Sequence, residues 1–266
     1  MCGIVGCVGN EAPQGIIIEG LKKLEYRGYD SAGIAVVNDG KIKLRKHVGA
    51  IVNLEKLIGK ENLGGHVGIG HTRWATHGAP SDVNSHPHMS NDNRIALVHN
   101  GTIENYVEIR TELEKEGFTF KSDTDSEVAA VLFGKYYNEL GDLKATMDKV
   151  THEMTGTFAL AAIAEDQPEK FVAYRKNAPL IVGKGNGCNF VASDFSALLK
   201  YTKDVYLLET GDTVILTPDG VTIYDESGKE IKRETMHISW DESVAEKGKY
   251  EHFMLKEIFD QPKAIE

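Results

Sequence analysis

The feature that most restricts the fold of this chain is a long series of short, strand-like runs that helical periodicity interrupts in the middle. The runs are rich in β-branched, aliphatic and aromatic side chains, which predicts strands. Turn sequences such as 38–40 and 218–220 end several of them. The runs cover residues 4–8, 33–37, 41–48, 67–74, 95–99, 158–164, 171–175, 180–182, 190–193, 205–208 and 213–216.

Apolar residues at helical spacing predict several helices, two of them in the middle of the chain. Ile17, Leu21 and Leu24 recur at the spacing of one helical face. Because strands flank the central helices on both sides and do not alternate with them one by one, we expect an α+β layered architecture and not repeated βαβ units. The other helical segments lie within residues 106–113, 128–136 and 142–154.

The charge of the chain argues against some classes of partner. It has 40 acidic and 30 basic residues and a formal net charge of −10, which disfavours nucleic acid or an anionic membrane as the main partner. The basic stretch 41–47 alternates and is interpreted as a half-exposed strand. No apolar run approaches the ~20 residues of a membrane span, and the N-terminus lacks the pattern of a signal peptide.

Three cysteines at irregular spacing, Cys2, Cys7 and Cys188, do not resemble a disulfide framework, so we expect a reducing, cytoplasmic location. Cys7 lies in an apolar run and is interpreted as a core residue. Cys2 becomes the first residue once Met1 is removed. Its α-amine, with a reference pKa of about 7.7–8.0, and its thiol, at about 8.5, then supply a base and a nucleophile from one residue. Taken alone, such a cysteine is more often part of a core.

Two polar segments follow strand-like runs, where loops commonly carry sites. In the segment 71–78, Arg73 offers a planar guanidinium suited to a carboxylate, although a surface loop with a solvated ion pair would give the same pattern. In the pair Asn100-Gly101, the side-chain amide and the backbone N–H can donate to one oxygen as an oxyanion hole. The alternative for this pair is a tight turn.

Three further patterns have simpler interpretations. The segment 122–127 contains residues that cap the following helix, although a spare carboxylate there can bind an ammonium group. The histidines of 71–77 and 86–88 lack a carboxylate or thiol at ligand spacing, so we expect no metal site. The glycines of 183–187 fit neither phosphate-binding pattern and indicate a hairpin turn.

Segments spread over the whole chain carry a family resemblance, namely residues 2–6, 24–33, 71–78, 84–88, 99–105, 122–127, 191–194 and 251–258. Together they resemble the class II glutamine amidotransferase domains of the glutamine–fructose-6-phosphate aminotransferase family. Related domains for purine or asparagine synthesis share the early cysteine and the Asn-Gly pair. The segment 26–33, the loop around Trp74 and the C-terminal segment favour the aminosugar family. Cys188 departs from the pattern, because an acidic residue is expected there.

The resemblance implies an N-terminal nucleophile hydrolase fold, a four-layer αββα sandwich with antiparallel sheets. It implies that Cys2 attacks the side-chain amide of glutamine and that ammonia and then glutamate are released through a thioester, without a cofactor. Asn100 and Gly101 hold the oxyanion, while Arg73 and Asp125 bind the α-carboxylate and α-ammonium groups. The remaining implied residues are Thr76 and His77 as polar contacts, His86 and Trp74 as walls or cover of the pocket, and Arg27 as a brace.

The resemblance also divides the chain into two parts. Residues 1–239 are expected to form the glutaminase domain, and 240–266 a linker helix with an apolar face. In the family the linker leads to sugar-phosphate isomerase domains, absent from this sequence, in which ammonia reacts with fructose 6-phosphate. The parent is expected to be a homodimer. The apolar residues of the linker helix are Tyr250, Phe253, Met254 and Ile258.

Two alternatives stay open. The chain could be the glutaminase domain of another class II amidotransferase. It could also be a non-catalytic binding module if Met1 is retained, because the nitrogen of Cys2 is then an amide and cannot act as a base.

Overall fold

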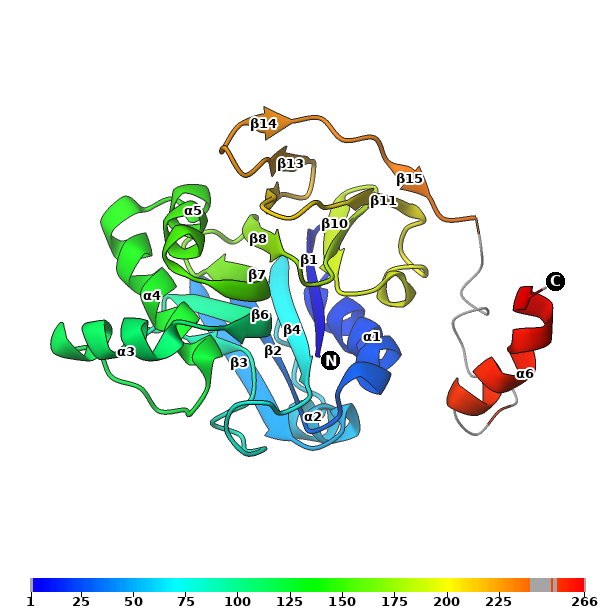
Figure 1. Cartoon of the computed structure of the whole chain (residues 1–266), viewed down its shortest axis with the longest axis horizontal. Coiled ribbons are helices and arrows are strands. Elements are labelled where there is room, and N and C mark those ends of the chain that lie inside the picture. The colour runs from blue at the N-terminus through cyan, green and yellow to red at the C-terminus, as the bar shows by residue number, and fades with distance from the viewer. Residues whose placement is uncertain (1, 240–249, 251–252, 266) are drawn as a thin grey trace.

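The structure, a computed structural model, describes residues 2–239, 250 and 253–265. Its strands form two sheets that stack on each other, and helices cover the outer face of each sheet (Figure 1). The named strands pair with their neighbours in antiparallel fashion in both sheets. The predicted α+β fold with four αββα layers is therefore confirmed.

The first sheet has eight strands, and the N-terminal strand lies near its centre. Their spatial order is β15-β11-β9-β10-β1-β4-β2-β3. Strand β1 pairs with β4 on one side and with β10 on the other, so both of its edges are hydrogen-bonded. The strands are β1 (Gly3–Gly9), β2 (Ser31–Asn38), β3 (Lys41–Val48), β4 (Val67–Arg73), β9 (Ile181–Lys184), β10 (Cys188–Ala192), β11 (Asp204–Leu207) and β15 (Met236–His237).

The second sheet has seven strands in the order β14-β13-β12-β8-β7-β6-β5. Its longest pairing joins β6 and β7 from Ile95↔Ala164 to Ile103↔Gly156. The tight-turn interpretation of Asn100-Gly101 is wrong, because β6 continues through both residues. The strands are β5 (His88–Met89), β6 (Ile95–Ile103), β7 (Gly156–Ala164), β8 (Phe171–Lys176), β12 (Thr213–Leu216), β13 (Val221–Tyr224) and β14 (Glu230–Ile231).

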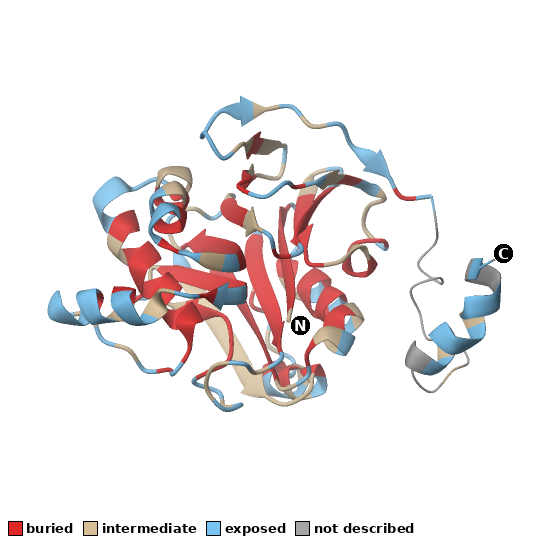
Figure 2. Cartoon of the chain, viewed as in Figure 1, coloured by how far each residue is buried: buried red, intermediate tan, exposed pale blue. Residues whose placement is uncertain are grey.

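Helices on the two outer faces complete three hydrophobic layers, which are the buried regions at the centre of Figure 2. Apolar side chains of α1 and α2 pack on the first sheet, those of α3, α4 and α5 pack on the second sheet, and the third layer lies between the sheets. Helix α2 was not predicted, although Ile51, Leu54 and Ile58 are buried along it. The helices are α1 (Pro13–Leu24), α2 (Ile51–Ile58), α3 (Tyr106–Lys115), α4 (Asp125–Leu140) and α5 (Leu143–Glu153), with short 3₁₀ turns η1 (Glu25–Arg27) and η2 (Phe195–Ala197).

Several local predictions are confirmed. The basic stretch 41–47 lies in the half-exposed strand β3, and the glycines of 183–187 lie in the hairpin between β9 and β10. Cys7 is buried in the core. Thr124 caps α4 by accepting a hydrogen bond from the backbone N–H of Glu127, as the segment 122–127 predicted.

The C-terminal helix α6 spans Phe253–Ile265 and stands apart from the sandwich in Figure 1. Tyr250, which was predicted to lie on the helical face, precedes the helix, and its ring stacks on Phe259 with the centroids 5.5 Å apart. Ile258 is exposed. The predicted boundary at 240 and the linker residues 240–249 lie outside the described residues. Within the part that the structure describes, no helix is both long and apolar enough to cross a bilayer.

Candidate active site

Four parts of the chain that are far apart in the sequence converge at one end of the two stacked sheets. Cys2 directly precedes β1, Arg73 ends β4 in the same sheet, and Asn100 lies in β6 of the opposite sheet. Asp125 begins helix α4, which covers the opposite sheet. Their side chains line or border one small cavity. In Figure 1 the N-terminus lies in the middle of the molecule, beside β1 and β4.

The thiol of Cys2 packs against the backbone of Trp74, the first residue after β4. Its sulfur lies 3.3 Å from the backbone nitrogen of Trp74 and 3.5 Å from the Trp74 carbonyl oxygen. Burial raises the pKa of the Cys2 thiol, while the Trp74 amide and the Arg73 guanidinium oppose that rise. The thiol of this chain is therefore mostly protonated at neutral pH, and its activation needs a base.

The amide of Asn100 links the two sheets at this point. Its Nδ2 donates to the backbone oxygen of Cys2 at 3.1 Å and to Oγ of Ser193 at 2.9 Å. Its Oδ1 accepts from Nε2 of His71 at 2.8 Å, and that same Nε2 also lies 3.0 Å from the carbonyl oxygen of His99. These bonds fix which end of the amide faces Cys2, so that its donor atom and not its acceptor lies beside that residue.

Gly101 adopts a backbone conformation that only glycine tolerates there. Its φ is +116°, and a Cβ at this position would lie 2.0 Å from the carbonyl oxygen of Thr157 on the paired strand. The residue lines the same cavity as Cys2. The close approach of β7 therefore accounts for a glycine at this position, whatever its role in chemistry.

The guanidinium of Arg73 is buried and only partly satisfied. One terminal nitrogen donates to the carbonyl oxygens of His77 and Gly78, at 2.9 Å for Gly78. The other, Nη1, is buried and has no hydrogen-bond partner among the described residues. Burial lowers the pKa of this guanidinium, an effect that the nearby Cys2, Asp30 and Asp125 oppose. A buried, unpaired donor of this kind is costly unless an anion completes it.

Asp125 occupies the first turn of α4, where a carboxylate is favoured by the helix dipole. Its Oδ2 accepts from the backbone N–H of Ile103 at 3.0 Å, and its Oδ1 from Oγ of Ser126 at 3.3 Å. The side chain is nearly buried and lines the cavity. Arg73 and Asp125 thus place a positive and a negative group around one small space.

Behind these residues lies a buried histidine cluster, which we define as His71, His86, His88 and His99. The rings of His71 and His86 stack with their centroids 4.0 Å apart, and Nδ1 of His86 lies 3.3 Å from the backbone nitrogen of His99. Burial lowers the pKa of His71 to about 3 and lowers those of the other three. The cluster is therefore neutral at pH 7, and its rings act as hydrogen-bonding and packing groups. Among the residues described, no group with the ligands for a metal ion is found.

The other predicted residues lie around the entrance or behind the site. Trp74 and Thr76 are exposed, and the Trp74 ring contacts Tyr29 edge-on at 5.6 Å. His77 contacts Tyr106 in the same manner. Arg27 does not line the cavity and instead bonds Asp194 at 3.0 Å. All predicted residues except Arg27 therefore lie at the cavity or, for Asn100, beside it.

Two residues that hold Asn100 were not singled out from the sequence. His71 belongs to the predicted segment 71–78, but its contact with Asn100 crosses from one sheet to the other. Ser193 follows β10 and also accepts a hydrogen bond from the backbone N–H of Ile4 at 2.9 Å. In the sequence, Ser193 stood out only because it lies in the family-like segment 191–194. That resemblance does not reveal which residues Ser193 contacts.

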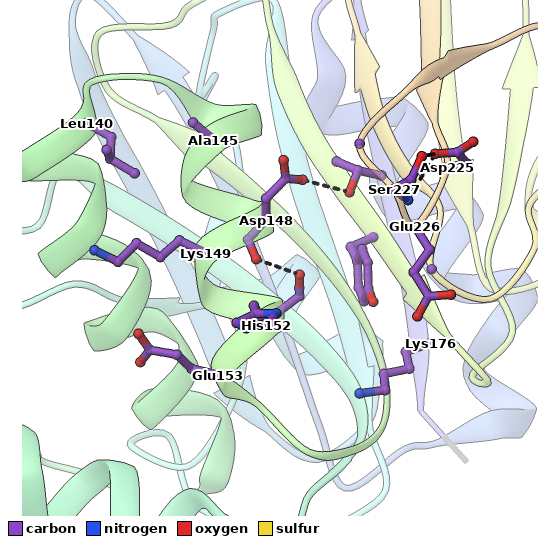
Figure 3. A pocket seen from close by; sticks show the side chains of 15 residues that line it. Leu140, Ala145, Asp148, Lys149, His152, Glu153, Lys176, Asp225, Glu226 and Ser227 are labelled. Carbon is purple, nitrogen blue, oxygen red and sulfur yellow. Dashed lines mark hydrogen bonds between the residues drawn. The ribbon is translucent and has the colours of Figure 1, made fainter.

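The cavity at Cys2 is small, with a volume of about 20 Å³, whereas a much larger cavity, of about 750 Å³, lies elsewhere. Figure 3 shows this larger space between α5, β8 and the turn before β14. Its lining carries both signs of charge, including Asp148, Glu226 and Lys176, but no cysteine. Its Lys149 pairs with Glu139 at 3.4 Å. The size of a cavity therefore does not identify the candidate site in this protein, whereas the grouping of nucleophile, amide and opposite charges does.

Comparison with known proteins gives a consistent result. Residues 71–200 match the glutamine amidotransferase domain family. The glutamine–fructose-6-phosphate aminotransferases (isomerizing) of Clostridium perfringens and Aquifex aeolicus are 55% and 48% identical to this chain over 265 residues, which is 100% of the chain. The chain spans 43–44% of the length of these relatives. The glutamine phosphoribosylpyrophosphate amidotransferase of B. subtilis superposes with a TM-score of 0.73 at 26% identity, covering 86% of this chain and 50% of that one.

Proposed function

We propose that this chain, which is a glutamine amidotransferase domain with an N-terminal nucleophile hydrolase fold, hydrolyses the side-chain amide of glutamine to glutamate and ammonia. The observation that carries the proposal is the convergence of Cys2, Arg73 and Asp125 on one cavity, with the Asn100 amide beside it. The site thus offers a nucleophile, a donor for an oxyanion, and one charge for each end of an amino acid.

Cys2 attacks the amide carbon after Met1 has been removed. The free α-amine of Cys2 then takes the thiol proton, through a bridging water, and passes it to the departing nitrogen. Ammonia leaves and a γ-glutamyl thioester forms on Cys2. Water then adds to the thioester, glutamate is released, and the thiol is restored, so that one glutamine and one water give one glutamate and one ammonia.

Asn100 and Gly101 stabilise the oxygen that becomes negative in the tetrahedral intermediate. Both hydrogens of the Asn100 amide are engaged here, by Cys2 O and by Ser193 Oγ. During turnover the bond to Cys2 O is exchanged for one to the substrate oxygen, while His71 and Ser193 keep the amide oriented. The Asn100 amide then bonds the substrate oxygen more strongly in the transition state than in the bound substrate, and such a difference accelerates the reaction.

The two ends of the substrate are bound by opposite charges. The unpaired Nη1 of Arg73 receives the α-carboxylate, and the carboxylate of Asp125 receives the α-ammonium group. Thr76 and His77 add polar contacts from the loop after β4, and His86 forms a wall. Arg27 braces the site through Asp194.

The loop that begins at Trp74 controls access. A cavity of about 20 Å³ is too small for glutamine, and the Trp74 backbone lies directly against the Cys2 sulfur. Substrate therefore enters when residues 74–78 move outward, and Trp74 covers the bound substrate when they return. Such loop motion commonly sets the rate of turnover in enzymes that must exclude water.

At a finer level, we propose that the domain comprises residues 1–239 and that 240–266 link it to the rest of a cytoplasmic, homodimeric aminotransferase. In that parent the ammonia would convert fructose 6-phosphate to an amino sugar. The support is the name and identity of the relatives, of which this chain matches one part. A different ammonia acceptor is the alternative, and full-length parent protein given several acceptors distinguishes the two.

The test measures glutamate release from glutamine, together with the intact mass of the purified chain. A chain lacking Met1 should release glutamate, and Cys2→Ala should abolish this activity, whereas Cys7→Ala should retain it because Cys7 is not part of the site. An electrophilic glutamine analogue should label Cys2.

Two outcomes contradict the proposal. Unchanged glutamate release in Cys2→Ala would exclude Cys2 as the nucleophile. Absence of both turnover and labelling in a chain shown to lack Met1 would favour a non-catalytic binding module.

A further inference from the structure

Cys7 and Cys188 lie on neighbouring strands, on the same outer face of the first sheet. In the register of β1 and β10, Cys7 is opposite Phe190 and Gly9 is opposite Cys188. Since side chains alternate along a strand, positions 7 and 9 of β1 and positions 188 and 190 of β10 face the same side. Cys7 and Cys188 both belong to the hydrophobic layer under helix α1, so the two cysteines are diagonal neighbours there.

The side chain of Cys188 lies unusually close to β1 because Gly9 has no side chain. A Cβ added at Gly9 would lie 2.5 Å from the Cβ of Cys188 and 2.6 Å from its sulfur. Such distances mean that Cys188 occupies the space that a side chain at position 9 would need. Its sulfur is thereby brought over β1, on the face of the sheet that carries Cys7, whose own thiol donates to the carbonyl oxygen of Pro13 at 3.9 Å.

The two thiols differ in environment. Cys7 is buried, and burial together with the neighbouring Cys188 raises its pKa well above the usual value. Cys188 is partly exposed, and the neighbouring Cys7 thiol lowers its pKa, although burial opposes this. Low pKa and access to solvent are the two properties that make a cysteine reactive toward oxidants.

We propose that Cys7 and Cys188 form a peroxide-reactive thiol pair, in which Cys188 is oxidised first and Cys7 resolves it to an intramolecular disulfide. In the first step the Cys188 thiolate attacks a hydroperoxide, so that the O–O bond breaks, Cys188 becomes a sulfenic acid, and hydroxide or an alkoxide leaves and takes up a proton from water. In the second step the Cys7 sulfur attacks the sulfenic sulfur, and water leaves with the Cys7 proton. Two thiols are oxidised by two electrons, and the peroxide is reduced.

This pair is separate from the candidate active site. Cys7 is five residues along β1 from Cys2, a distance of roughly 16 Å at ~3.3 Å per strand residue. Neither Cys7 nor Cys188 lines the cavity at Cys2. The inference therefore does not depend on the proposed glutaminase activity, and its test uses mass and not turnover.

The test treats the whole chain with hydrogen peroxide, blocks free thiols, and maps the peptides by mass spectrometry after trypsin digestion. Cys2 and Cys7 lie in one tryptic peptide that ends at Lys22, whereas Cys188 lies in residues 185–200. The experiment is therefore done in a Cys2→Ala background, which leaves Cys7 as the only partner in the first peptide. We expect the two peptides to be joined, with the loss of two hydrogen atoms, and a reductant to separate them.

Two further variants separate the steps. In the Cys2→Ala background, Cys188→Ser should abolish the joined peptide. Cys7→Ser should instead leave Cys188 as a sulfenic acid that a dimedone-type reagent traps. Cys188→Ser replaces a partly exposed side chain with a slightly smaller one, and its circular dichroism and thermal unfolding should match those of the parent.

Three results would overturn the inference. Both thiols could remain alkylatable after peroxide treatment of the folded chain. Cys188 could proceed to sulfinic acid while Cys7 stays reduced. The joined peptide could also form equally well in guanidinium chloride, which would show that the folded geometry does not bring the thiols together.

Discussion

Replacement of Asn100 by alanine tests the proposed oxyanion site most directly. The substitution removes one side-chain donor that lies beside Cys2 and leaves the nucleophile, Arg73 and Asp125 in place. Loss of one oxyanion donor typically costs ~2.7–4 kcal/mol of transition-state stabilisation. We therefore expect kcat for glutamine hydrolysis to fall about 100- to 1000-fold, with little change in KM, because the ends of the substrate are bound by other residues.

The same substitution also lowers the stability of the folded chain, by an amount that the structure bounds. Asn100 makes three side-chain contacts, to Cys2 O, Ser193 Oγ and His71 Nε2. After substitution Ser193 still accepts from Ile4, and His71 still reaches the carbonyl oxygen of residue 99. At ~0.5–1.5 kcal/mol per net hydrogen bond, loss of all three contacts costs about 1.5–4.5 kcal/mol. Thermal unfolding measures this loss, so that activity is assayed well below Tm.

A matched control is Ser193→Ala, which removes one partner of the Asn100 amide and leaves its donor atoms in place. Its kcat should fall less than about tenfold, a change of ~1.4 kcal/mol. A fall of less than tenfold in Asn100→Ala would refute the oxyanion role. Equal losses in the two variants would show that the effect comes from the position of β6 and not from the donor itself.

Three further predictions concern stability. The histidine cluster is buried and neutral, with the pKa of His71 lowered to about 3. Because the unfolded chain binds protons on these four rings below about pH 6.5 and the folded chain does not, the free energy of unfolding should fall by about 1.2 kcal/mol per ring, or about 5 kcal/mol in all, between pH 7 and 5.5. Urea unfolding measures this fall, and a pH-independent value would contradict it. Lys46 donates to the carbonyl oxygens of residues 83, 85 and 87. Lys46→Met should therefore lower the free energy of unfolding by about 2–3 kcal/mol. The matched control is Lys41→Met, because Lys41 is an exposed residue of the same strand and its replacement should change the free energy of unfolding little. Gly101→Ala should destabilise the chain by at least ~1–3 kcal/mol, because φ is +116° there and Thr157 leaves no room for a Cβ; an unchanged Tm would show that β6 can move away.

The layers of the fold could be predicted because they depend on local periodicity. Strand β3, for example, was predicted with its observed bounds from alternation between 41 and 48. Helix α2 was missed because its eight residues supply only three buried side chains, Ile51, Leu54 and Ile58, directly after a strand. Strand β6 was ended too early because Asn-Gly usually marks a turn, whereas pairing with β7 holds the strand extended through both residues.

The candidate site could be predicted only through the family resemblance. No spacing rule brings Cys2, Arg73 and Asp125 together, since their contact depends on how two sheets and a helix stack. The bond between His71 and Asn100 crosses from one sheet to the other. Periodicity fixes which face a side chain takes, but not which residue of another sheet it meets.

The central position of β1 has a consequence for the timing of synthesis. This strand is made before one of its two neighbours, β10, which ends at Ala192, and Ser193 bonds the nitrogen of Ile4 across 189 residues. At ~5–20 residues per second, roughly 10–40 s pass between synthesis of β1 and synthesis of that partner. Throughout this interval the Cys2 thiol exists before Ser193, whose contact orients the Asn100 amide beside it, has been made. Cys2 is thus synthesised well before the residues that complete its surroundings.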